Sequence, residues 1–345
     1  MPPAPTMQDI ATAAGQGKST VSLALRNDPK IREETRQRIQ KIAREMGYRT
    51  NVMVANLMTQ LRTSQIPRCK AAIGYLTAAS EKGSLKRVHP FDQWQTGCRI
   101  RAAEVGYELN EFPLAGGEGS LVGSLIKKFK SRNVHGLIVA YVTENRTLPE
   151  EFTELWESYG CIVIGVQTSS PPVHFVSNDQ YFTALEAVKK VLNLGYRHPG
   201  LVLDPEIDRM VGHRFSSGFH SAEHLMSFGG SLPHLKFSLD GREKFKAWFR
   251  RHQPDVIFTL HDKIRDWLLE MNVNSPRDVG LVHLDLTPGI RNWAGMNQNN
   301  AQIGMAAVDM LVSQLHRNES GPPLFTQCQF VKSHWVDGGT LIRLK

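Results

Sequence analysis

The chain has 345 residues, enough for two or three domains, and its 41% hydrophobic and 21% charged residues are typical of a folded globular protein. No apolar run approaches the length of a membrane span, and the four cysteines form no Cys-x-x-Cys pair, which argues against disulfides and a thiolate metal site. The net charge of +8 is concentrated in residues 1–68, which hold 11 Lys and Arg against 5 Asp and Glu, a balance that suits contact with nucleic-acid phosphates.

Three short helices are predicted in this basic segment. Gly15 ends the first helix because glycine readily adopts positive φ, the second helix is expected over residues 18–25, and Gly47 ends the third. Apolar side chains recur at helical spacing along them, at Ile10, Ala13, Ala14, Val21, Ala24, Leu25, Ile39, Ile42, Ala43 and Met46. Two short helices joined by a glycine turn are the arrangement that places one helix in the major groove of DNA.

A nucleotide-binding loop is an alternative interpretation of the same residues. The letters GQGKST at residues 15–20 match the end of a P-loop. The complete motif also needs a glycine at the position of Thr12 and a buried strand before it, whereas the segment before Gly15 has a helical pattern. The sequence therefore favours a DNA-binding helix over a phosphate-binding loop.

A dense set of motif positions runs through the first 51 residues. Its members are Asp9, Ile10, Ala11, Ala14, Gly15, Thr20, Val21, Ser22, Leu25, Asn27, Ile31, Thr35, Arg36, Arg38, Ile39, Gly47, Tyr48 and Asn51. In these positions the segment resembles the LacI/GalR family of bacterial repressors. It departs from the family pattern at Gln16 and Gly17 in place of Val-Ser, at Arg32 in place of a capping Ser, and at Thr50 in place of Pro. Glycine is a tolerable N-cap, so the start of the second helix is expected to survive.

The resemblance implies a homodimer that binds a near-palindromic operator in double-stranded DNA. The residues expected to contact DNA are Lys18, Ser19, Thr20, Ser22, Leu23, Asn27, Asn51 and Leu57. Among them, Lys18, Ser19 and Leu23 occupy the base-reading positions, whereas Thr20, Ser22 and Asn27, together with the Arg and Lys residues of the third helix, are expected mostly to contact phosphates. Leu57 is expected to enter the minor groove from a hinge helix within residues 51–58, although a simple linker is the alternative for so short a segment.

Apolar runs alternate with helical segments in the rest of the chain. Strand candidates lie at residues 71–76, 108–112, 136–141, 161–165, 200–203, 235–239, 255–260 and 278–284. Such alternation indicates parallel sheets that are covered on both faces. The predicted fold is therefore an all-α helix-turn-helix head followed by an α/β core of two parallel-sheet subdomains, and the family resemblance implies a core similar to periplasmic sugar-binding proteins.

The expected domain organisation has a head at residues 6–49, a hinge helix and linker at 50–69, and a core at 70–345 that binds the effector and dimerises. Within the core, we expect one subdomain from residues 70–167 with 297–328, and the other from 168–296 with 329–345. In such folds the ligand lies in the cleft at the carboxyl ends of the strands.

Three residues are candidates for contact with a small-molecule effector. Asp285 follows an apolar strand and matches a family aspartate that accepts hydrogen bonds from the effector, although an Asp that caps the next turn is the alternative. Arg214 lies one residue from the position of a family arginine that clamps the effector, and a surface arginine is equally consistent with this spacing. His261 follows another strand and can contact a ligand or serve a structural role.

Two enzyme-like patterns carry less weight. His220 and His224 flank an H-x-x-E-H pattern typical of zinc peptidases, but a zinc site needs a third ligand. The glycines of residues 117–123 resemble a dinucleotide-binding turn, but the third glycine is displaced and the motif follows the second strand rather than the first. We therefore expect no catalytic residues, no metal and no cofactor.

These observations predict a cytoplasmic, homodimeric, sequence-specific DNA-binding transcription regulator that acts as a repressor. A small molecule, expected to be sugar-like, would change its operator affinity from the core cleft. The alternative function is a sugar-binding module or an enzyme with a vestigial DNA-binding head.

Overall fold

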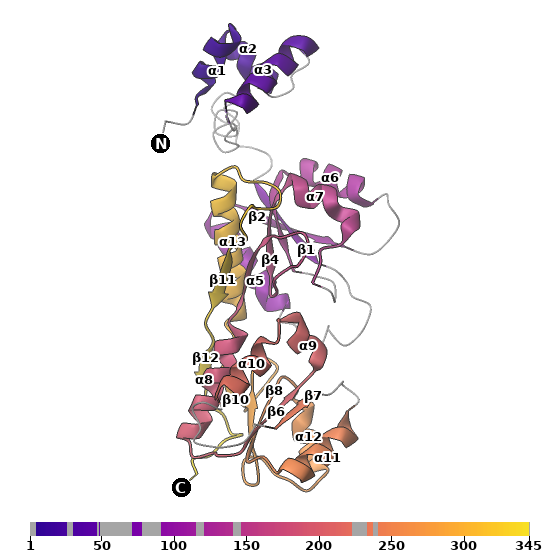
Figure 1. Ribbon diagram of the computed structural model, residues 1–345, viewed down its shortest axis with the longest axis vertical. Helices are drawn as coiled ribbons and strands as arrows, with labels where there is room; N and C mark the ends of the chain where they lie inside the picture. The colour runs from indigo at the N-terminus through magenta and orange to yellow at the C-terminus, as the bar shows by residue number, and fades with distance from the viewer. Residues whose placement is uncertain are drawn as a thin grey trace. The chain divides into compact units, whose positions relative to one another are not determined.

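The computed structural model describes residues 5–25, 30–46, 48, 71–77, 91–114, 121–140, 146–222, 233–236 and 241–344. The chain divides into two compact units, one that contains the three N-terminal helices and one that contains two β-sheets. Figure 1 follows the chain from the indigo N-terminal helices to the yellow C-terminal segment. Within the described residues, no helix is long and apolar enough to cross a membrane.

The head consists of helices α1 (Met7–Ala14), α2 (Lys18–Leu25) and α3 (Glu33–Glu45). A capping box starts α1, because the Thr6 hydroxyl accepts a hydrogen bond from the Asp9 amide and the Asp9 carboxylate accepts one from the Thr6 amide. Gly15 ends α1 in the left-handed conformation, with φ of 59°, as its sequence position predicts.

One prediction for the apolar core of the head is wrong. Ala13 is exposed, whereas Ala11 is buried between Ile10 and Ala14. Helical spacing allows either alanine of this short helix to face the core. The direction from which α2 and α3 pack against α1 decides which of the two is covered. The other predicted positions are buried or partly buried in one apolar cluster.

The first sheet of the core is entirely parallel and has the strand order β11-β5-β4-β3-β1-β2. Its strands are β1 (Ala72–Thr77), β2 (Glu108–Pro113), β3 (Val134–Val139), β4 (Gly160–Ile164), β5 (His174–Asn178) and β11 (Cys328–Val331). Its helices are α5 (Phe91–Glu104), α6 (Leu121–Ser131), η2 (Glu150–Phe152), α7 (Thr153–Ser158) and α13 (Asn300–His316). Side chains of α6 and α7 share one apolar core with β1, β3 and β4.

The second sheet has the order β12-β10-β9-β8-β6-β7, and only the edge strand β12 runs antiparallel to its neighbour. Its strands are β6 (Pro199–Leu203), β7 (His234–Lys236), β8 (Val256–Thr259), β9 (Gly280–His283), β10 (Ala294–Asn297) and β12 (His334–Val336). Its helices are α8 (Gln180–Asn193), α9 (Pro205–Met210), α10 (Arg214–Ser221), α11 (Arg242–His252) and α12 (Lys263–Leu269). Leu201 and Leu203 pack with α8 and α10, whereas Val202 packs with α11 and α12. Successive side chains of β6 therefore contribute to the apolar cores on both faces of the sheet.

Two strands lie outside the subdomain ranges that the sequence suggested. β5 pairs with β4 in the first sheet, although residues 168–178 were expected in the second subdomain, and most of β11 also lies beyond the expected boundary at residue 328. β5 contains the polar residues His174, Ser177 and Asn178, yet all five of its residues are buried. An apolar-run criterion misses such a strand because its polar groups are satisfied by hydrogen bonds only in the folded chain.

Helices α5 and α13 approach each other closely. A Cβ atom on Gly97 would collide with the Ala301 carbonyl, and one on Gly304 would collide with the Trp94 carbonyl, so glycine is required at both positions. The Cys98 thiol lies 3.3 Å from the Gly304 carbonyl oxygen at the same crossing. This packing brings Trp94, at the start of α5, next to the start of α13.

Candidate DNA-binding helix and ligand site

The outer face of α2 carries the side chains that were predicted to meet DNA. These residues, exposed or half-buried, are Lys18, Ser19, Thr20, Ser22 and Leu23. Val21 and Ala24 are fully buried on the opposite face, so the helix has a single orientation on the head. The other residues expected to contact DNA, Asn27, Asn51 and Leu57, lie outside the described residues.

Helix α3 fixes the C-terminal ends of the two helices before it. Gln40 donates from Nε2 to the Ala24 carbonyl at 2.9 Å, and Arg38 donates from its guanidinium to the Ala14 carbonyl at 3.3 Å. These bonds satisfy carbonyl groups that a helix end leaves without partners. The sequence does not reveal that Arg38 and Gln40 bind the ends of α1 and α2, because an arginine and a glutamine can equally contact phosphates.

Helix α2 begins with little help from side chains. The Val21 amide donates to the Gly17 carbonyl at 3.1 Å, which marks Gly17 as the first residue of the hydrogen-bond ladder. A Cβ on Gly17 would meet no atom within 4 Å, so the position is open. Arg32 likewise precedes α3 without a side-chain capping bond, and Glu33 and Glu34 supply negative charge at that N-terminus instead.

In the core, Asp285 and His261 lie just beyond the carboxyl ends of two neighbouring strands, β9 and β8. Asp285 is 6% exposed, and its Oδ1 accepts a hydrogen bond from Asn300 Nδ2 at 3.0 Å. Asn300 Oδ1 in turn accepts from the Trp94 indole nitrogen at 3.2 Å. The indole therefore fixes the orientation of the amide so that its NH₂ group faces Asp285. Asp285 and His261 are candidates from the sequence, and the structure adds Asn300 and Trp94 beside Asp285, which no motif marks.

Burial sets the charges in this cluster. Burial raises the pKa of Asp285 to about 7, and the hydrogen bond from Asn300 opposes this shift only in part. Burial lowers the pKa of His283 to about 4, with a further lowering from His261, and the Asp285 amide donates to His283 Nδ1 at 3.1 Å. Burial also lowers the pKa of His261. Near neutral pH the two imidazoles are uncharged, which suits a polar, uncharged ligand.

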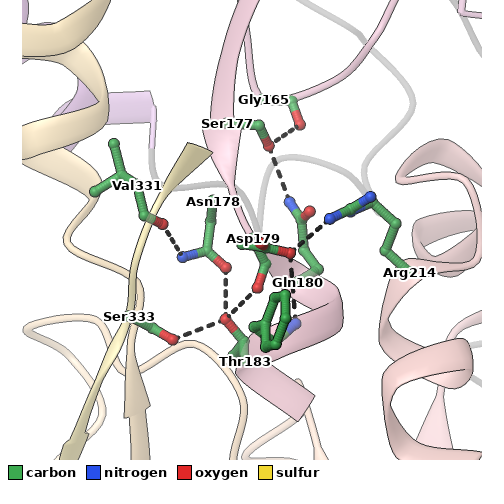
Figure 2. A network of polar contacts seen from close by, with 10 residues as sticks. Gly165, Ser177, Asn178, Asp179, Gln180, Thr183, Arg214, Val331 and Ser333 are labelled. Atoms are coloured by element: carbon green, nitrogen blue, oxygen red, sulfur yellow. Dashed lines mark hydrogen bonds and ion pairs between the residues drawn. The ribbon is translucent and has the colours of Figure 1, made fainter. Parts of the chain in front are cut away.

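Arg214 is engaged elsewhere. Its guanidinium donates to Asp179 Oδ1 at 2.5 Å and lies 4.5 Å from the centre of the Phe330 ring, as the right side of Figure 2 shows for the ion pair. Its Nε is buried and has no hydrogen-bond partner among the residues that the structure describes. The structure therefore brings Asp285 and His261 to one sheet edge but gives Arg214 a different set of partners.

Polar side chains join the segments that pass between the two sheets (Figure 2). Asn178, at the end of β5, donates to the Val331 carbonyl at 3.0 Å, and its Oδ1 accepts from Thr183 at 2.7 Å. The Thr183 hydroxyl also contacts the Ser333 hydroxyl at 2.8 Å. The Val331 carbonyl that Asn178 contacts lies 153 positions later in the chain, so no local pattern marks this crossing.

The enzyme-like patterns find no support in the described part of the chain. His220 and His234 place their rings 5.6 Å apart, His224 lies outside the described residues, and no group of three metal-binding side chains occurs within them. A helix rather than a strand precedes Gly15, so the P-loop hypothesis lacks its required context. Most of residues 117–123 lie outside the description as well.

Comparison with known proteins gives one family match and several full-length relatives. Residues 6–51 match the model for bacterial regulatory proteins of the lacI family. The HTH-type transcriptional regulator MalR of Streptococcus pneumoniae is 20% identical over 91% of this chain and 94% of its own length. PtxS of Pseudomonas putida, also an HTH-type transcriptional regulator, is 25% identical over 92% and 91%. CytR of Escherichia coli, an HTH-type transcriptional repressor, is 44% identical over 54 residues, 16% of either chain.

Solved structures with the same fold cover nearly the whole chain. The lac repressor dimer bound to operator and the anti-inducer ONPF aligns with a TM-score of 0.57 at 17% identity, over 99% of this chain and 100% of that one. A complex of the transcriptional regulator CelR with cellobiose aligns with a TM-score of 0.58 at 18% identity, over 97% and 99%. The predicted fold class, a helical head with a core of two parallel-sheet subdomains, is confirmed.

Proposed function

The chain belongs to the LacI/GalR family of bacterial transcription regulators, and we infer that it recognises operator DNA through the outward face of α2. The observation that carries this proposal is the division of α2 into two faces. Val21 and Ala24 are buried in the head, while Lys18 and Ser19 are exposed within the segment that matches the family model. A cationic and polar helix face with a fixed orientation is the requirement for readout in the major groove.

The regulator is proposed to act as a homodimeric repressor on a near-palindromic site. Support comes from the lac repressor, which shares the fold and was solved as a dimer on its operator. Two-fold symmetry of a dimer places one α2 in each of two half-sites. Leu57 and Asn51 remain proposed contacts from the hinge segment, with Leu57 in the minor groove. A cytoplasmic location follows from the proposed DNA partner, and we assign no enzymatic activity because the relatives are named as regulators.

A carbohydrate is the proposed effector, and Asp285 and His261 are its proposed contacts. The buried carboxyl group and uncharged imidazoles suit hydroxyl groups better than an anionic ligand. CelR, which shares the fold, was solved with cellobiose. Arg214 is a proposed contact through its Nε, while one of its two terminal nitrogens is bonded to Asp179.

Selection of bound duplexes from a random pool tests the DNA-binding proposal directly. The full chain should enrich a near-palindromic site, and its affinity should fall steeply with salt because phosphates are neutralised by lysine and arginine. Enrichment of no sequence, with retention of the fold, would contradict the proposal and favour a ligand-binding module with a vestigial head.

Thermal unfolding with added sugars tests the effector proposal. A panel of neutral mono- and disaccharides, including cellobiose, should contain a compound that raises the melting temperature of the full chain. Asp285→Asn should abolish that shift, while its DNA binding without sugar should match that of the unchanged protein. A sugar that stabilises both proteins equally would exclude Asp285 from the site.

A further inference from the structure

Leu23 is an apolar side chain on the outward face of α2. It lies one helical turn after Ser19, and it is half-buried. The apolar cluster of the head contains Val21, Ala24 and Leu25 from the same helix, but it does not contain Leu23. The described core of the head therefore does not explain why this position is apolar.

The neighbours of Leu23 on this face are polar. Lys18 and Ser19 are exposed, and Ser22 is half-buried. Their ammonium and hydroxyl groups can bond to base edges and phosphates, whereas a leucine has no atom that donates or accepts a hydrogen bond. Leu23 can discriminate among base pairs only through apolar contact.

Among the four base pairs, the thymine C5 methyl group is the apolar feature of the major groove. We propose that Leu23 selects a thymine in each operator half-site by contact with that methyl group. This inference rests on the proposed DNA-binding function and adds the base that one named side chain recognises. Ser19 precedes Leu23 by four residues on the same helix face, so we expect Ser19 to contact a base pair next to that thymine.

Covering one methyl group is worth about fourfold in affinity, or about 0.8 kcal/mol, for each half-site. In a symmetric site with two such contacts the combined effect is about fifteenfold. An effect of this size is measurable by fluorescence anisotropy, and it is smaller than the loss expected when a phosphate-binding cation is removed.

Replacement of thymine by uracil tests this contact, since it removes the methyl group and leaves every hydrogen-bonding atom in place. The probe is the duplex selected by the full chain, with uracil placed symmetrically at one thymine position of the half-site at a time. At one position the uracil pair should weaken binding by the full chain about fifteenfold. Leu23→Ala, which preserves helix propensity, should bind the thymine and uracil duplexes equally.

Leu23→Met is the matched control, because it keeps an apolar side chain at the same position and should remain sensitive to uracil. Circular dichroism and binding to non-specific duplex at low salt report whether each variant keeps its folded head. If Leu23→Ala does not fold, Leu23→Gln takes its place, because it keeps the length of the side chain and a high helix propensity but replaces the apolar end by an amide. Leu23→Gln should bind the thymine and uracil duplexes equally, and a folded Leu23→Gln that keeps full uracil sensitivity would overturn the role of Leu23.

The possible failures are distinguishable. Equal affinity of the full chain for thymine and uracil duplexes at every position would overturn the role of Leu23, while the proposed operator binding would stand. Equal uracil sensitivity in the full chain and in folded Leu23→Ala would also overturn it, since another residue would then read the methyl group. A selection that enriches no site would remove the proposed function itself.

Discussion

The head and the core use their side chains in opposite ways. In the head, the functional candidates are exposed on one face of a short helix, and a small apolar cluster holds them in place. In the core, the functional candidates Asp285 and His261 are buried, and Asp285 is held by Asn300, which in turn accepts a hydrogen bond from Trp94. We therefore expect substitutions at the proposed DNA contacts of the head to cost little stability, because these side chains are exposed or half-buried, whereas substitutions at the buried candidates of the core should also affect folding.

The largest expected effect concerns Lys18 in the head. Lys18→Glu replaces an exposed cation by an anion in each protomer, so affinity for the selected operator should fall on the order of a hundredfold at low salt. The free energy of unfolding should stay within about 0.5 kcal/mol, as for other surface substitutions.

The control for this experiment is Lys244→Glu, which makes the same charge change at an exposed position of α11 in the core. Anisotropy titrations at several salt concentrations should show little change for this variant. An equal loss of affinity in both variants would mean that net charge, rather than the face of α2, controls binding.

The second prediction concerns the buried amide of the core. Asn300→Ala removes the donor to Asp285 and the acceptor for the Trp94 indole, both within a site where Asn300 is 1% exposed. Buried groups left without partners cost about 1–3 kcal/mol each, so the core should lose about 2–4 kcal/mol in urea unfolding.

Trp94→Phe removes the indole donor and leaves the bond from Asn300 to Asp285 in place, but it also removes part of a buried ring. The lost hydrogen bond and the lost ring volume should together cost about 2 kcal/mol in urea unfolding. Sequence-specific DNA binding by either variant should persist below its unfolding temperature. An unchanged stability of Asn300→Ala would show that the amide has no structural role in the core.

The third prediction concerns pH. Because the folded state raises the pKa of Asp285, the folded protein binds its proton more tightly than the unfolded chain does. This contribution to stability is fully present below the ordinary pKa of an aspartate and is lost as pH rises through about 7. Asp285→Asn removes it, so the free energy of unfolding should rise more steeply with pH between 4 and 7 in the variant.

His283 provides the opposite control. Its pKa is lowered to about 4, so the folded state disfavours its protonation and stability falls as pH drops below the ordinary value near 6.5. His283→Asn should therefore flatten the low-pH side of the same curve. Urea titrations at half-unit pH intervals measure both slopes, and parallel curves for all three proteins would contradict the assigned charges.

The smallest expected effect returns to the head. Gly17→Ser adds a hydroxyl that can accept a hydrogen bond from the start of α2, at a position where a Cβ meets no other atom. We expect a gain of a few tenths of a kcal/mol in the stability of the head, visible as slower amide hydrogen exchange in α2. Gly15→Ser is the matched control, and it should destabilise because Gly15 has a φ of 59°.

The sequence alone determined those features that depend on neighbours along the chain. The helical spacing of apolar residues located α1, α2 and α3, and Gly15 marked a helix end because positive φ is a local property. Apolar runs located most strands of both sheets for the same reason, since a strand buried on both faces must be apolar along its length. The outward face of α2 was predictable as well, because the residues of a short helix that do not face the core must face solvent.

The tertiary structure decided everything that depends on distant partners. Only the direction of packing selected Ala11 over Ala13, and only hydrogen bonds from other segments made the polar strand β5 acceptable in a buried sheet. The neighbours of Asp285 come from α5 and α13, whose close crossing depends on two glycines far apart in the chain. Local patterns carry no record of such contacts, because burial and hydrogen bonding in the core are set by which elements meet in space.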